Sequence, residues 1–123
     1  MTPAQVATVL GTAASIKRVF NDGRICDPVG QRNICTMPYA EIKVGDDMTE
    51  HDGSARLLRR TIIGRVVFLR HATSESALRI ELLNAFAARS ADQMHLQLEA
   101  TQERGRLCVM PISVTGFASV VKS

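Results

Sequence analysis

Residues 61–69 are Thr-Ile-Ile-Gly-Arg-Val-Val-Phe-Leu, and this stretch decides how the rest of the chain can be arranged. β-Branched and aromatic residues dominate it, which favours an extended strand. Apolar side chains fall at both odd and even positions, so we expect a central strand covered on both faces. Gly64 within it marks a bulge or a close approach of a neighbouring backbone. The whole extended segment is predicted to cover residues 55–70.

Three segments precede this strand. Residues 3–20 carry apolar side chains at three- and four-residue spacing behind a Thr-Pro pair, which predicts one long amphipathic helix. Residues 39–44 alternate between apolar and polar side chains, which is typical of a half-buried strand. Residues 45–53, Gly-Asp-Asp-Met-Thr-Glu-His-Asp-Gly, are too polar to pack, so they are predicted to form a hairpin loop.

The segments after the long strand predict a helix, two strands and a tail. Residues 74–89 have helical periodicity, and their apolar positions are wide enough to predict burial on more than one side. Alternation predicts a strand at 94–98 and another at 107–112. Pro111 cannot donate to a ladder, which places the last strand at a sheet edge or a bulge. Residues 116–123 are predicted to be a flexible tail.

These elements follow the order α-β-β-α-β-β in a chain of 123 residues, which suits one domain spanning 1–123. Consecutive strand pairs predict a mainly antiparallel four-stranded sheet with the helices packed on it, an α+β fold.

Composition excludes several classes of function. With 4% aromatic residues and no Trp, a platform for stacking nucleobases is not expected. The net charge of +3 permits only weak attraction to nucleic acid. No apolar run approaches the ~18 residues of a membrane span, and the N-terminus lacks a signal-peptide pattern. The three cysteines are expected to be free in a reducing cytoplasm, although Cys26 and Cys35 are close enough in sequence to pair.

Each residue that could take part in catalysis or metal binding can also be explained as an ordinary surface residue. His51 lies among acidic residues, but the spacing fits no known calcium or zinc motif, so a solvated hairpin tip is favoured. A catalytic role for His71 or His95 would require Ser or Cys nearby in space. The chain has no phosphate-binding glycine loop and no nucleophile elbow. We therefore expect a protein that is not an enzyme and needs no cofactor or metal.

The strongest concentration of charge consists of five arginines on the long strand: Arg56, Arg59, Arg60, Arg65 and Arg70. They could contact phosphate, pair with acidic groups of a neighbouring subunit, or cover a solvated sheet face. Alternation divides them between the two faces, which weakens a single DNA-binding stripe. We favour subunit contact together with a solvated face.

The order of short motifs resembles the tail terminator, or tail completion, proteins of long-tailed phages and phage-like particles. The resemblance begins with the N-terminal helix and Gly23-Arg24-Ile25 followed by Asp27. It continues through Pro38-Tyr39, which open a strand ending at Gly45, and through the polar loop, the strand to Leu69 and the helix at 74–89. The chain departs from the pattern at Cys26, where an aromatic is expected, and at Pro111.

The resemblance implies a non-enzymatic virion protein, made in the host cytoplasm and assembled into the tail or neck. Members form a hexameric ring at the head-proximal end of the tail tube, stop its polymerisation and offer a docking surface for the neck. The implied partners are further copies of the chain, the major tail tube protein and a head–tail connector or neck protein. DNA only passes through the channel.

The residues expected at a subunit or tube interface lie in and beside the polar loop: Asp46, Asp47, Glu50, His51, Asp52, Arg56, Arg59 and Arg60. Two alternatives remain open at this stage. One is a different head–tail joining or neck protein, and the other is a small cytoplasmic protein-binding domain.

Overall fold

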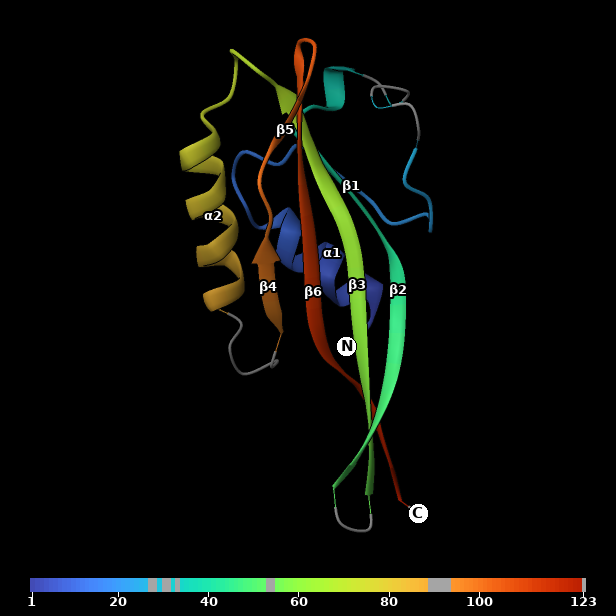
Figure 1. The fold of residues 1–123 in the computed structure, drawn as a ribbon. Coiled ribbons are helices and arrows are strands. Elements are labelled where there is room, and N and C mark those ends of the chain that lie inside the picture. Colours follow the sequence, from blue (N-terminus) through green and yellow to red (C-terminus); the bar gives the residue numbers. More distant parts are fainter. Residues whose placement is uncertain (27–28, 30–31, 33, 53–54, 89–93, 123) are drawn as a thin grey trace.

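Two α-helices and a six-stranded mixed sheet make up the fold (Figure 1). The computed structural model describes residues 1–26, 29, 32, 34–52, 55–88 and 94–122, and the side chains of residues 49–57 and 118–122 lie outside that description. The elements are α1 (Pro3–Gly11), β1 (Arg18–Phe20), a 3₁₀ turn η1 (Ile34–Thr36), β2 (Tyr39–Asp52), β3 (Ala55–Leu69), α2 (Glu75–Ala87), β4 (His95–Leu98), β5 (Gln102–Arg104) and β6 (Leu107–Lys122).

The strands follow the order β1-β2-β3-β6-β4, and β5 pairs with β6 beside β4. β1 runs parallel to β2, and every other pairing is antiparallel. The α+β class is confirmed, and so is the central position of β3. The sheet is mainly antiparallel, as predicted, but the predicted number of four strands is wrong. The two additional strands are β1, from a segment expected to be helical, and β5, from the segment between the last two predicted strands.

Both helices cover the same face of the sheet and bury one core against it. The buried residues from α1 and α2 are Val6, Val9, Leu10, Leu78, Leu82 and Phe86, and they pack on Ile42, Ile62, Val66, Phe68, Met110 and Val114 of the sheet. In Figure 1, α1 lies behind the strands. We call this side the helix face and the other side the open face.

The first helix is shorter than predicted. α1 ends at Gly11, and the chain then forms turns and enters β1. Gly and Thr are weak helix formers, and the Thr12 hydroxyl bonds the carbonyl of Val9 at 2.6 Å. Ala13 and Ile16 are nevertheless buried in the main core. The regular apolar spacing therefore predicted the buried residues correctly, but its prediction of a helix beyond Gly11 is wrong.

The predicted loop at 45–53 is instead mostly strand, because β2 continues to Asp52 and pairs with β3. The register shifts between Val44 and Asp47, where a bulge re-aims the strand. The prediction that β2 is half-buried is also wrong. Tyr39 and Glu41 are fully buried on the open face, where Met37, Val67 and Val109 join Tyr39 in a second, smaller core.

Gly64 marks a close approach of two backbones, as predicted. A Cβ at this position would stand 2.1 Å from the carbonyl oxygen of Glu41. Any larger residue would push β2 and β3 apart.

The C-terminal strand corrects two predictions. Residues 116–122 continue β6 and pair with β3, so they are not a flexible tail, and Ser123 lies outside the described residues. β6 is internal rather than an edge. Pro111 is tolerated because it falls between the segments of β6 paired with β5 and with β4. Its carbonyl accepts from the Glu99 amide at 3.0 Å, so its ring nitrogen points the same way, away from β3.

α2 begins after its N-cap Ser74 and buries only one side. Leu78, Leu82 and Phe86 face the core. Ile80 is 58% exposed and Leu83 is 49% exposed, so the prediction that the helix is buried on more than one side is wrong.

The longest strands continue past both helices. We call the arm residues 45–52 of β2, 55–60 of β3 and 116–122 of β6. Figure 1 shows these three strand ends extending beyond the level of α1 and α2. We call the rest of the molecule the body.

Candidate functional site: the arm and the Glu41 cluster

The predicted interface residues fall on the arm. Asp46 and Asp47 lie on β2 at the bulge and are exposed. Arg60 is paired within its own chain, because its Nε and Nη2 donate to the Asp47 carboxylate at 3.0 and 3.1 Å. This hydrogen bonding lowers the pKa of Asp47. Arg59 lies on the open face, with its guanidinium 6.0 Å from the Phe117 ring.

The remaining predicted residues take positions in the paired strands of the arm. His51 is opposite Arg56, and Glu50 and Asp52 flank His51 on β2. Their side chains lie outside the described part of the structure. The structure therefore brings these eight residues onto one arm, where Asp47 and Arg60 form an ion pair.

Both edges of the sheet carry unpaired backbone in the described residues. β1 pairs with β2 only at Tyr39, Ala40 and Glu41, so the outer side of β2 is free from Ile42 onward. At the other end of the sheet, β4 has β6 on one side and no strand on the other. Unpaired edges of this kind are templates for pairing with another chain.

A buried charge cluster on the open face was missed by sequence reasoning. We call Asp22, Arg32, Glu41 and Arg65 the Glu41 cluster. The Glu41 carboxylate accepts from Arg32 Nε at 3.0 Å and lies 3.3 Å from Arg65 Nε. It also accepts from the backbone N–H of Cys26 at 3.1 Å. The Glu41 side chain is fully buried, and those of Arg32 and Arg65 are 8% and 12% exposed.

Arg32 links the cluster to the surface. Its two terminal nitrogens donate to the Asp22 carboxylate at 3.0 Å each, and this hydrogen bonding lowers the pKa of Asp22 to about 2. The Arg32 guanidinium also stacks 4.0 Å from the Phe20 ring centroid. Phe20 in turn meets Tyr39 edge-on, and burial followed by the Glu41 charge raises the pKa of Tyr39 to about 12.

The Glu41 cluster ties the connector between β1 and β2 to the sheet. Alternation had placed Glu41 with Lys43 on a solvated face, and nothing local to Glu41 indicates burial. The sequence feature that could have indicated this burial is Arg65, a lone charged residue inside an otherwise apolar strand. Arg65 is the direct cross-strand neighbour of Glu41. A buried carboxylate between two guanidinium groups is satisfied and holds structure together.

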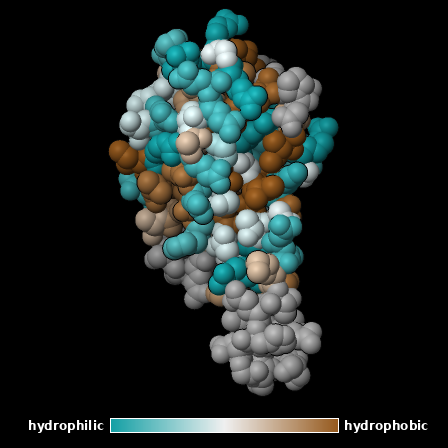
Figure 2. Space-filling model, in the orientation of Figure 1, coloured by the Kyte–Doolittle hydropathy of each residue, from teal (hydrophilic) through white to brown (hydrophobic). Residues whose placement is uncertain are grey.

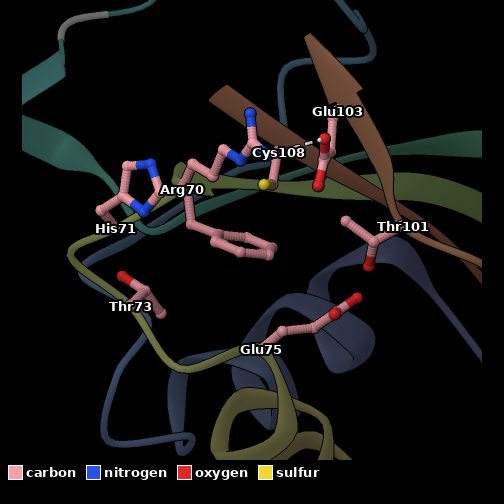
Figure 3. A pocket seen from close by; sticks show the side chains of 8 residues that line it. Arg70, His71, Thr73, Glu75, Thr101, Glu103 and Cys108 are labelled. Atoms are coloured by element: carbon pink, nitrogen blue, oxygen red, sulfur yellow. Dashed lines mark ion pairs between the residues drawn. The ribbon is translucent and has the colours of Figure 1, made fainter. Parts of the chain in front are cut away.

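A small polar pocket lies where β3 ends and α2 begins (Figure 3). Its volume is about 290 Å³, and Arg70 and Glu103 form an ion pair of 3.2 Å across it. His71, Glu75 and Cys108 also line it. Burial, followed by the nearby Glu103 charge, raises the pKa of the Cys108 thiol. This burial disfavours the thiolate, the form in which a cysteine acts as a nucleophile.

Three further observations concern the described residues alone. They contain no group of three or more His, Cys, Asp or Glu side chains placed to hold a metal ion. Cys26 and Cys35 are not joined to each other by a disulfide in this structure. None of the helices has the length and apolar character needed to cross a membrane.

No protein-family model matches the sequence, and no curated protein matches it significantly.

Proposed function

We propose that this chain is a virion structural protein that forms a ring at the head-proximal end of a phage tail tube. There it ends polymerisation of the tube and provides the surface on which the neck docks. The proposal rests on the sequence resemblance and on one structural observation, the arm. Three strand ends continue past the helices that cover the body, and in the described residues no other element covers them.

The arm needs a partner on physical grounds. A small ribbon of strands is marginally stable when nothing packs on its faces. Exposed strand edges also invite pairing with other chains. A ring subunit that contacts both its neighbours and the tube supplies such a partner.

The arginines support assembly over DNA recognition. Arg60 is held by Asp47, and Arg65 is held by Glu41 on the other face of the sheet. The two side chains therefore cannot form one stripe along a DNA backbone. Arg60 fixes β3 to β2 within the arm, so its contribution to assembly is to shape the arm rather than to reach a neighbour.

Native mass spectrometry and negative-stain imaging of the purified chain, alone and with isolated tail tubes, test the proposal. The expected result is a closed oligomer, a hexamer by the resemblance, seated at one end of each tube. A strict monomer at high concentration that leaves tubes uncapped overturns it. Rings that bind isolated heads but not tubes would instead favour another neck protein.

Fluorescence anisotropy with duplex DNA across a salt series separates assembly from nucleic-acid binding. We expect weak binding by the purified chain. Tight binding that falls steeply with salt, and that Arg59→Glu removes without affecting assembly, contradicts the assignment.

A further inference from the structure

The outward side of α2 lacks the charged residues that a helix facing water normally carries. The structure describes the whole helix, and the exposed residues along its outward side include Ser76, Ile80, Leu83 and Ala87. Figure 2 shows hydrophobic surface on the α2 side of the molecule. Continuous exposed apolar surface of this kind marks a contact with another protein.

The three charged residues of α2 are bonded within the chain. Arg79 forms an ion pair with Glu75 and donates to the backbone carbonyl of Glu99. Glu81 accepts from both the backbone N–H and the hydroxyl of Ser15. Within α2, the outward side therefore has no charge with which to attract an oppositely charged partner or to repel a second copy of itself.

We call Ser76, Ile80, Leu83 and Ala87 the α2 seam. They are spaced by four, three and four residues, as are the contact positions of a two-helix coiled coil. At 3.6 residues per turn, the four residues lie within about 60° of one another around the helix. The seam is therefore one stripe along the length of α2.

The α2 seam is symmetric about its midpoint, which falls between Glu81 and Leu82. When a second α2 lies antiparallel across it, Ile80 stands opposite Leu83 of the second copy. Ser76 then stands opposite Ala87 of the second copy. Large side chains meet at the centre and small ones at the ends, so the two helices can pack closely. The same stripe serves both copies, which makes the contact isologous.

The groove beside α2 borders the seam. Its volume is about 240 Å³, and its lining residues are Leu83, Phe86, Ala87, Met94, His95 and Leu96. Two of these residues, Leu83 and Ala87, belong to the seam. In the antiparallel arrangement, Ile80 of the second copy stands opposite Leu83, so it covers this side of the groove and removes apolar surface from water.

We propose that α2 of one copy packs antiparallel on α2 of a second copy, through the α2 seam and about a two-fold axis. The contact goes beyond the proposed function, because a two-fold contact joins two copies and does not by itself build a ring. It lies on the body, whereas the ring contacts are assigned to the arm. The seam is short, so the free chain should form a weak, reversible dimer.

Cysteine cross-linking tests the direction of the two helices. In a Cys35→Ser background, Ser76→Cys combined with Ala87→Cys should give a covalent dimer on oxidation and no larger species. Within one helix the two positions are about 16 Å apart, too far for an internal disulfide.

Each single cysteine variant is the matched control for the double variant. An antiparallel pair holds the two copies of either position about 16 Å apart, so neither single variant should cross-link. Covalent dimers from the single variants, or a folded double variant that gives none, would overturn the antiparallel arrangement.

Charge substitutions test the seam without cross-linking. In sedimentation equilibrium, Ile80→Glu and Leu83→Lys should each raise the dimer dissociation constant by about tenfold or more, because each places two like charges in the contact. An equal mixture of the two variants should dimerise again, since opposite charges then meet. Ala77→Glu, which is exposed but outside the seam, should change the constant by less than about twofold. Circular dichroism of each variant checks the fold.

The outcomes separate this pairing from the proposed ring. A wild-type chain that stays monomeric up to about 1 mM without tubes overturns the pairing, and so do seam variants that dimerise as the wild type does. Neither result affects the tube-capping test. Seam-dependent dimers from a chain that leaves tubes uncapped overturn the proposed function and leave the pairing intact. If a cysteine variant unfolds, the mixture of charge variants still decides.

Discussion

The body and the arm are built from the same three strands, yet different forces hold them. In the body, β2, β3 and β6 have α1 and α2 on one face and the Glu41 cluster with the second core on the other. In the arm, the same strands keep their backbone pairing but lose the helices. Hydrophobic burial stabilises the first region, and backbone hydrogen bonding together with the Asp47–Arg60 ion pair maintains the second. The same strand ladder is therefore covered on both faces in the body and left without helices in the arm.

The largest difference in stability loss is expected between a variant that breaks the ion pairs of the body and one that breaks the ion pair of the arm. Glu41→Ala should lower the free energy of unfolding by about 3–5 kcal/mol, because it leaves two largely buried guanidinium groups without a counter-charge. Asp47→Ala should hardly move the urea midpoint, because its pair with Arg60 is in solvent contact. Urea unfolding followed by far-UV circular dichroism measures both. Equal shifts of the urea midpoint in the two variants would show that the Glu41 cluster stabilises the fold no more than the Asp47–Arg60 pair does.

Adjacent leucines on α2 give a matched test of burial. Leu82→Ala should lower the free energy of unfolding by about 2–5 kcal/mol, because Leu82 is fully buried between the helix and the sheet. Leu83→Ala, one residue further and 49% exposed, should change the monomer by less than about 0.5 kcal/mol. The measurement is urea unfolding at a concentration below assembly. A large loss for Leu83→Ala would mean that the Leu83 side chain is part of the core.

Hydrogen exchange should separate the two regions within one molecule. In the isolated chain, we expect amides of residues 116–122 to exchange faster than those of residues 108–114 on the same strand, because no helix covers them. Assembly should slow the arm amides by tenfold or more and leave the body unchanged. Equal protection in the isolated chain would remove the physical reason for assigning the arm to contact.

The smallest effect is expected from acid titration of Asp22. Its pKa is lowered from 3.8 to about 2 by the Arg32 hydrogen bonds, so the pair contributes stability fully above about pH 4. That contribution is lost as the pH falls toward 2. Between pH 4 and 2, the wild-type chain should therefore lose more stability than Asp22→Asn, as judged by urea midpoints. Parallel curves would show that Arg32 does not depend on Asp22.

Sequence patterns predicted the elements whose signals are local. The two-sided apolar pattern of β3 correctly indicated a central strand, and the helical spacing that includes Leu78 and Leu82 correctly indicated α2. Residues 45–52 were mistaken for a loop because their polar side chains carry no hydrophobic alternation, although they pair with the next segment of the chain in a hairpin. Residues 116–122 were mistaken for a tail although Phe117, Val120 and Val121 favour a strand, because their pairing partner in β3 is far away along the chain.

The candidate site was only partly predicted, because its contacts also depend on how segments of the chain pair in the folded structure. Asp47 and Arg60 were named as contact residues, but their mutual pairing depends on the register of β2 against β3. Glu41 was missed because Arg32 reaches it from the connector, outside any regular element. Burial of a charged residue is decided by such distant partners, and a simple alternation pattern assigns it to solvent.

Pro111 has a consequence for unwanted aggregation. β4 and β5 lie end to end along one side of β6, and a continuous edge there would offer a long template for amyloid-like growth. Because Pro111 lacks an N–H and faces that side, the ladder is interrupted between the two short strands. The interruption divides this side of the sheet into two short strands, so an incoming chain meets β4 or β5 and not one long edge.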